Sequence, residues 1–246
     1  MAVTAYHHFR YSIEQYYARI TPYERHLLLS TLQAFTRAMD AYNLTYFLYG
    51  GSLLGSYRHH GIIPWDDDVD IMMNSSQKEL IKKALGKKSP DYELDIPPSG
   101  QWKFYYTHMH NLLNRNHRWP YVDMFFFEEN STHIWDEVPE YGKTFIFRKN
   151  KVFPLRNRPF NHLMVHAPCN PAACMNGYTE EICVASSYSH KEETPLPVYK
   201  WVTVPCDKLK FRFPFIQRTQ FDDGAWNESL VNNTKLIHTI ITPKYC

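Results

Sequence analysis

The stretch YGGSLLGSYRHHGIIPWDDDVDIMM, from Tyr49 to Met73, decides the fold of the surrounding chain. Two glycines and a serine stand near its start, and a row of aspartates that ends with Asp70 stands near its end. The apolar pattern predicts a strand that stops at Gly50, a short helix over SLLGSYR, a turn at HHGIIPW and a half-buried strand over DVDIMM. This order of elements is typical of part of an α/β unit.

The aspartates of this stretch indicate a metal site. Asp68 and Asp70 are one residue apart on the expected strand, so both side chains share one face, and Asp66 has the same parity. Two carboxylates this close repel each other, and one keeps its proton unless a cation lies between them. Oxygen ligands suit Mg²⁺ or Mn²⁺. An EF-hand loop that starts at Asp66 is excluded, because its sixth and twelfth positions would be isoleucine and glutamine.

The glycines indicate a phosphate site next to the metal. Gly50, Gly51 and Ser52 precede the expected helix, where backbone N–H groups and a hydroxyl can bind a phosphate with little side-chain bulk nearby. Arg58 lies in the turn that follows and is the best candidate for a cation that meets the phosphates. The alternatives are a plain tight turn for the glycines, a solvated surface for the acids and a solvated polar turn around Arg58.

The flanking sequence predicts the elements around this stretch. Thr21, Pro22 and Glu24 form the start of a capped helix, whose apolar residues recur as one buried stripe. Further on, the apolar strand YVDMFFFEE carries a single acid, Asp123, in its first half, and THIWDEV with KTFIFRK predicts a hairpin. From Ser186 onward only strand-like pieces broken by prolines can be recognised.

Composition limits the classes of function. A net charge of +2 without a stripe rich in Lys or Arg gives no support for nucleic acid binding. All five cysteines lie in the C-terminal third and match no Cys-x-x-Cys zinc pattern, which favours disulfides or buried thiols. Because their number is odd, at least one has no partner within the monomer.

Targeting features point in two directions. No apolar run approaches the roughly 20 residues needed to cross a bilayer, so membrane association is expected only through a segment that this sequence does not contain. The five Asn-x-Ser/Thr sequons, against about one or two expected by chance, indicate the lumen of the secretory pathway. They are Asn43, Asn74, Asn130, Asn227 and Asn232.

The string GGSLLGSYRHHGIIPWDDDVDI resembles a pattern of the nucleotidyltransferase superfamily, a glycine turn followed by Asp-x-Asp on a strand. In its full length it is similar to one branch, the LicD family of bacterial phosphocholine transferases and the animal fukutin and fukutin-related proteins. YVDMFFF is similar to the second acidic strand of that family, and VFPLRNRPFNHLMVHAPCN to a later segment. The resemblance covers roughly residues 43–170.

The resemblance implies an α/β (α+β) fold with a nucleotidyltransferase-like mixed β-sheet flanked by helices. The strand-like pieces near the C-terminus add a β-rich extension. Three parts are expected: an N-terminal helical segment over residues 1–42, a LicD catalytic core over 43–185 and a C-terminal extension over 186–246.

The resemblance also implies a metal-dependent phosphotransferase. Such an enzyme moves a phospho-alcohol, for example phosphocholine or ribitol phosphate, from a CDP-alcohol donor to a hydroxyl of a glycan or glycoprotein, and releases CMP. The implied catalytic residues and ligands of Mg²⁺ or Mn²⁺ are Asp68, Asp70 and Asp123. The implied substrate-binding residues are Gly50, Gly51, Ser52, Arg58 and Asp66.

With the sequons, this resemblance predicts a place in the Golgi lumen. Two alternatives stay open: a nucleotidyltransferase that acts on another acceptor, and a non-catalytic glycan-binding or regulatory module of the same fold.

Overall fold

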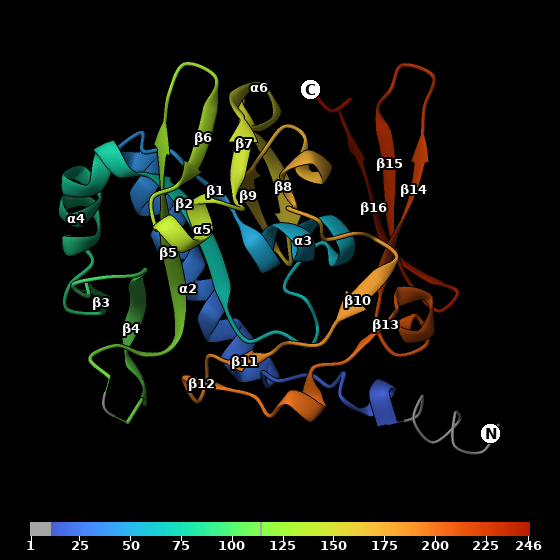
Figure 1. Cartoon of the computed structure of the whole chain (residues 1–246), viewed down its shortest axis with the longest axis horizontal. Helices are drawn as coiled ribbons and strands as arrows, with labels where there is room; N and C mark the ends of the chain where they lie inside the picture. Colours follow the sequence, from blue (N-terminus) through green and yellow to red (C-terminus); the bar gives the residue numbers. More distant parts are fainter. Residues whose placement is uncertain (1–10, 114) are drawn as a thin grey trace.

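A mixed β-sheet forms the centre of the computed structural model, which describes residues 11–113 and 115–246 (Figure 1). Within these residues seven strands join the sheet, and only β2 and β5 pair in parallel. Five strands lie side by side in the order β1 (Tyr46–Leu48), β2 (Val69–Asn74), β5 (Arg118–Glu129), β4 (Trp102–Asn111) and β3 (Tyr92–Asp95). The far end of β5 pairs with the hairpin of β6 (His133–Asp136) and β7 (Ile146–Arg148). The predicted mixed sheet and hairpin are confirmed.

Helix α2 (Pro22–Ala41) packs against β4 and β5. The Glu24 N–H donates to Thr21 Oγ1 at 3.2 Å, and the Thr21 N–H donates to a Glu24 carboxylate oxygen at 2.8 Å, which confirms the predicted capping box. The predicted apolar stripe faces the sheet and is fully buried. It consists of Leu28, Leu32, Phe35 and Met39.

Helix α3 (Gly50–His59) connects β1 to β2 and is fixed to the start of β2. It begins directly at the two glycines, two residues earlier than the pattern SLLGSYR predicts. The Tyr49 N–H donates to the Asp70 carbonyl oxygen at 3.2 Å, and the Asp70 N–H donates to Ser52 Oγ at 2.8 Å. These two bonds hold the first turn of α3 beside the acidic strand.

Short elements complete the sheet region. The helical ones are η1 (Ser75–Gln77), α4 (Lys78–Gly86), α5 (Pro139–Gly142), α6 (Lys149–Val152) and η2 (Pro171–Cys174). The strands β8 (Arg156–Phe160) and β9 (Leu163–Ala167) form a hairpin that packs against β1 and α3. The short helix predicted over NPAACMNGY is the 3₁₀ turn η2.

The C-terminal part is β-rich, as predicted. Its largest sheet is the antiparallel meander of β14 (Phe215–Gln220), β15 (Trp226–Asn232) and β16 (Lys235–Thr242), on the right of Figure 1. Two smaller pairs precede it: β10 (Ile182–Val184) with β13 (Thr203–Pro205), and β11 (Tyr188–Ser189) with β12 (Thr194–Pro195). Two 3₁₀ turns accompany them: η3 (Val198–Lys200) lies between β12 and β13, and η4 (Cys206–Leu209) lies between β13 and β14.

One disulfide ties the end of the C-terminal part to the segment that follows β9, and a second lies within the C-terminal part. Cys169 is bonded to Cys246 and Cys183 to Cys206, while Cys174 is buried and unpaired. The prediction of disulfides with at least one unpaired thiol is confirmed. One cluster of buried apolar residues contains members from the N-terminal part, the sheet and the C-terminal part. Among the described residues, no helix combines the length and apolar character needed to cross a bilayer.

Candidate active site

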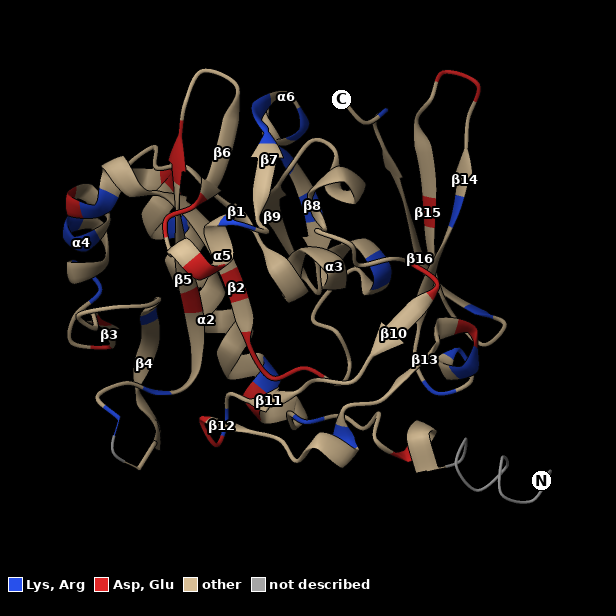
Figure 2. Ribbon diagram, viewed as in Figure 1, with Lys and Arg blue, Asp and Glu red and all other residues tan. Residues whose placement is uncertain are grey.

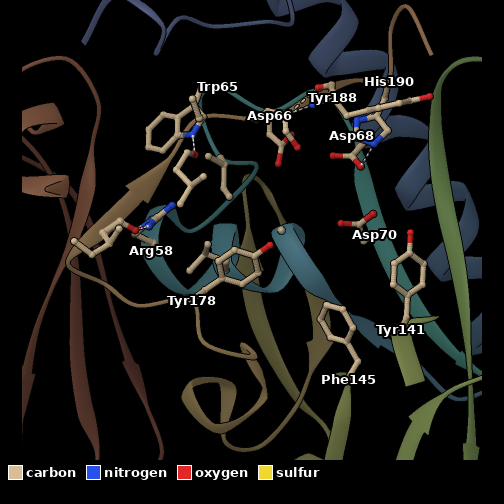
Figure 3. A pocket seen from close by; sticks show the side chains of 18 residues that line it. Arg58, Trp65, Asp66, Asp68, Asp70, Tyr141, Phe145, Tyr178, Tyr188 and His190 are labelled. Atoms are coloured by element: carbon tan, nitrogen blue, oxygen red, sulfur yellow. Dashed lines mark hydrogen bonds and ion pairs between the residues drawn. The ribbon is translucent and has the colours of Figure 1, made fainter. Parts of the chain in front are cut away.

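Three aspartates line a cavity between α3, the start of β2 and the segment around β10 and β11. Asp66, Asp68 and Asp70 all face this cavity, whose volume is about 550 Å³ (Figure 3). Figure 2 shows the acidic loop that enters β2 as a continuous red segment, with further acidic positions on β2 and β5. The predicted same-face arrangement of the acids is therefore present.

Asp123 joins this group from the neighbouring strand. Asp70 and Asp123 are register partners on the parallel strands β2 and β5, so their side chains share one face of the sheet. Lys103 Nζ donates to Asp123 Oδ2 at 3.0 Å. The other oxygen, Asp123 Oδ1, is buried without a hydrogen-bond partner, and the Asp70 carboxylate makes no hydrogen bond or ion pair to a described residue. A buried carboxylate oxygen without a partner, as Asp123 Oδ1 is, is suited to bind a cation.

Burial and neighbouring carboxylates together raise the pKa values of Asp70 and Asp66. Burial raises the pKa of Asp70 well above its usual range, and the charges of Asp68 and Asp123 raise it further. Burial, followed by the charges of Asp68 and Asp67, raises the pKa of Asp66 to about 8. These directions show an excess of negative charge, which a divalent cation offsets.

His190 lies between β11 and β12 and lines the same cavity. The sequence did not identify it as a site residue. Its Nδ1 lies 3.0 Å from Asp67 Oδ1, and its Nε2 forms an ion pair of 3.2 Å with Asp68 Oδ2. Ligand atoms of His190 and of Asp66, Asp67 and Asp68 lie within 4.8 Å of one another. Burial lowers the pKa of His190, but Asp68 and Asp67 outweigh it and raise this pKa to about 10.

The glycines lie directly against the carboxylates. A Cβ atom on Gly51 would lie 3.2 Å from Asp66 Oδ2 and 3.7 Å from Asp70 Oδ2, and Gly51 lines the cavity. Ser52 is buried and its Oγ accepts from the Asp70 N–H, so its hydroxyl is occupied in joining α3 to β2. At Gly50 and Gly51, α3 therefore places only backbone next to the carboxylates.

Arg58 lies in the wall of the same cavity. Its side chain is 4 % exposed, which excludes the solvated turn as an alternative. The guanidinium donates to the Ile182 carbonyl oxygen at 3.2 Å and lies 5.7 Å from the centre of the Trp65 ring. Aromatic side chains also line the cavity, among them Tyr141, Phe145, Tyr178 and Tyr188.

Residues 43–170 match the family model described as the nucleotidyltransferase domain of LicD, FKTN and FKRP, which is more than half of the chain. The chain belongs to the LicD family. The resemblance read from the sequence is thereby confirmed. The matched residues contain all five aspartates and both glycines of the site, whereas His190 lies outside the LicD match.

Individual relatives agree with this membership. Lipopolysaccharide cholinephosphotransferase LicD of Haemophilus influenzae is 40% identical over 60 residues, 24% of this chain and 23% of that protein. The ribitol-5-phosphate transferase FKTN of Mus musculus is 25% identical over 71% of this chain and 35% of its own length. The ribitol 5-phosphate transferase FKRP of the same species is 27% identical over 58% of this chain and 29% of its own length.

The chain thus spans well under half the length of these curated relatives. A solved structure of ANT(2″)-Ia with adenylyl-2″-tobramycin aligns at a TM-score of 0.36 and 9% identity, over 56% of this chain and 67% of that one. This likeness is too low to bear on function.

Proposed function

We propose that this LicD-family chain is a metal-dependent phosphotransferase. It would move a phospho-alcohol such as phosphocholine or ribitol phosphate from a CDP-linked donor to a hydroxyl of a glycan or glycoprotein, with release of CMP. The observation that carries the proposal is the convergence of Asp68, Asp70 and Asp123 beside the first turn of α3, at the end of a cavity of about 550 Å³. The names of the relatives, a cholinephosphotransferase and two ribitol phosphate transferases, support the same reaction class.

The donor set fits Mg²⁺ or Mn²⁺. Asp68, Asp70 and Asp123 offer only oxygen atoms, which these cations prefer, and the buried Asp123 Oδ1 has no partner within the described chain. These three residues would hold the ion. When bound, it would neutralise the charge of the donor diphosphate and stabilise the charge that develops during transfer.

The residues of the chain itself would position the donor. Backbone N–H groups at the start of α3, next to Gly51, would bind phosphate oxygens, and the buried Arg58 would supply a fixed positive charge in the same cavity. Asp66 lines the cavity beside Gly51 and would contact the substrate there.

The transfer itself would need one proton acceptor. The acceptor hydroxyl would attack the phosphorus that carries the alcohol, the bond from this phosphorus to the bridging oxygen would break, and CMP would leave with that oxygen. The hydroxyl proton would go to Asp123 or to one of Asp68 and Asp70. None of these three carboxylates would need to move far to accept the proton. Asp70 and Asp123 are register partners on β2 and β5, and Asp68 lies in the loop directly before β2.

We propose that the protein acts in the secretory pathway and, within it, in the Golgi lumen. Two disulfides support an oxidising compartment. The sequons support it as well, since Asn43 and Asn130 are exposed. The test is a glycosidase digestion after secretory expression, which should lower the apparent mass of the chain. An unchanged mass would contradict this part of the proposal.

The test of the reaction is CMP release from CDP-choline, CDP-ribitol and CDP-glycerol. Each donor is incubated with Mg²⁺ or Mn²⁺, then with EDTA, with and without a mixed glycan acceptor. We expect CMP from one donor, dependent on the metal, from the wild type and from the surface control Asp222→Asn, but not from Asp70→Asn. If a folded, metal-bound protein releases CMP from none of the three donors, the proposal is refuted. That result would favour another nucleotide donor or a non-catalytic module.

A further inference from the structure

The disulfide between Cys183 and Cys206 closes a loop, residues 183–206, that reaches back to the acidic cluster. This disulfide loop contains the β11–β12 hairpin, whose turn carries His190. Figure 3 shows His190 beside Asp68 at the upper rim of the cavity, and the centre of the Tyr188 ring lies 5.1 Å from that of His190. A segment outside the part that matches the LicD family model therefore completes the wall of the candidate active site.

Core side chains hold the loop through its backbone. Trp65 Nε1 donates to the Val184 carbonyl oxygen at 3.0 Å, and Tyr16 Oη lies 2.7 Å from the Cys183 carbonyl oxygen. Arg19 donates to the Tyr188 carbonyl oxygen at 2.9 Å. These donors bind main-chain atoms, so the path of the loop does not depend on the side chain at position 190. A substitution there tests one side chain rather than the whole loop.

Asp67 connects the turn of the β11–β12 hairpin to the acidic segment before β2. Its Oδ1 accepts from His190 Nδ1 at 3.0 Å and its Oδ2 accepts from the Lys191 N–H at 3.1 Å. Asp67 itself is fixed, because its carbonyl oxygen accepts from Trp119 Nε1 at 2.9 Å. The imidazole is thus anchored through one nitrogen, and its other nitrogen is directed at Asp68.

Among the described residues, His190 holds Asp68 through only one of its two carboxylate oxygens. His190 Nε2 lies 3.2 Å from Asp68 Oδ2, while the other oxygen makes no hydrogen bond or ion pair to a described residue. Carboxylates that bind metals are commonly held by a second partner, which fixes their orientation and whose loss typically lowers metal affinity or activity by about 10- to 100-fold.

We propose that His190 is a positioning residue, which the disulfide loop delivers to the acidic cluster so that Asp68 presents its free oxygen to the cation. This rests on the proposed function in so far as Asp68 is taken to be a metal ligand. It does not depend on which phospho-alcohol or acceptor the protein uses.

The experiment measures Mn²⁺ binding by calorimetry on the whole chain, without donor or acceptor. The variants are His190→Ala, His190→Gln, which keeps one donor group, and Glu192→Ala, an exposed side chain of the same turn. We expect His190→Ala to bind Mn²⁺ about tenfold more weakly than the wild type. His190→Gln should lie between the two, and Glu192→Ala should equal the wild type. Thermal unfolding in EDTA shows whether each variant is folded.

Two results would overturn the proposal. Unchanged binding by a folded His190→Ala variant would mean that His190 does not position Asp68. Tighter binding would mean that the ring only competes with the cation for the carboxylates. If His190→Ala does not fold, His190→Gln decides by the same criteria.

Failure of the proposed function is distinguishable from failure of this inference. A wild type that binds Mn²⁺ but releases no CMP would refute the transferase while the effect of His190 stands. A wild type that binds no Mn²⁺ would refute both.

Discussion

A Cβ atom on Gly50 would lie 3.3 Å from Asp70 Oδ2, and the backbone of Gly50 has a φ of +49°. Both facts favour glycine at the first turn of α3. A left-handed backbone costs other residues about 1–2 kcal/mol, and a side chain here would also press on a carboxylate that we assign to the metal.

Gly50→Ala should therefore lower the free energy of unfolding by about 1–2 kcal/mol, and it should weaken Mn²⁺ binding. Urea denaturation measures the first effect and calorimetry the second. Gly86→Ala is the control, because Gly86 ends α4 and a Cβ atom there would meet nothing within 4 Å. It should leave stability unchanged or raise it slightly. Equal stability of Gly50→Ala and the wild type would contradict this assignment.

Asp70→Asn should separate stability from metal binding. Burial and the neighbouring carboxylates raise the pKa of Asp70, so removal of its charge relieves a repulsion in the absence of metal. We expect the Tm of the variant in EDTA to equal or exceed that of the wild type. Mn²⁺ at one hundred times its Kd should stabilise the wild type by about 2.7 kcal/mol and the variant much less. A full metal-dependent rise in the Tm of Asp70→Asn would show that the ion binds elsewhere.

The sequence predicted those residues of the site that lie close together in the chain. Gly50, Gly51, Asp68 and Asp70 are close in the chain, and turn chemistry and strand parity are enough to bring them together. Asp123 stood out as the one acid in an apolar strand, but its place in the site was inferred only from the resemblance of YVDMFFF to the second acidic strand of the LicD family. The capping box at Thr21 and Glu24 was recognisable for the same reason, because its signal spans four residues.

His190 could not be found this way. It lies more than one hundred residues from Asp68, in the turn SHKEET, which has no periodicity and reads as solvated surface. Only the long-range backbone contacts and the Cys183–Cys206 pairing place it, and neither has a local signature. Arg58 was recognised as a candidate, but its burial depends also on the carbonyl oxygen of Ile182, which is a non-local partner.

Loss of the Cys183–Cys206 disulfide should affect both stability and the site. The bond joins residues 23 apart, and a loop of this size corresponds to about 3 kcal/mol of stabilisation. The double variant Cys183→Ser, Cys206→Ser should lose about that much in urea denaturation. Its Mn²⁺ affinity should also fall, because the loop that carries His190 becomes less constrained.

The second disulfide provides the matched control for this prediction. Cys169 and Cys246 are 77 residues apart, and both lie outside the lining of the cavity. Replacing both with serine should lower stability by a comparable or larger amount. Mn²⁺ affinity of the folded protein should stay as in the wild type. Equal losses of Mn²⁺ affinity in the two double variants would mean that the disulfide loop has no special role at the site.

A buried ion cluster joins the C-terminal meander to the core. The Glu228 side chain of β15 is fully buried and contacts His60 Nε2 at 2.9 Å, Arg158 at 2.8 Å and Arg218 Nε at 3.1 Å. Burial alone would raise the pKa of Glu228. The hydrogen bond from His60 and the charges of Arg158 and Arg218 outweigh burial and lower this pKa from its ordinary 4.5 to about 2.

The stability that this cluster contributes should disappear in acid. Because the pKa of Glu228 is lower in the folded chain than in the unfolded one, its contribution is complete above about pH 4.5 and is lost as the pH falls toward 2. A shift of this size corresponds to roughly 3 kcal/mol. Urea denaturation at several pH values should show the wild type losing this amount across that interval. Glu228→Gln should be less stable at neutral pH and show a smaller slope, whereas the exposed Glu79→Gln should keep the wild-type slope. An unchanged slope in Glu228→Gln would assign the acid sensitivity to other carboxylates.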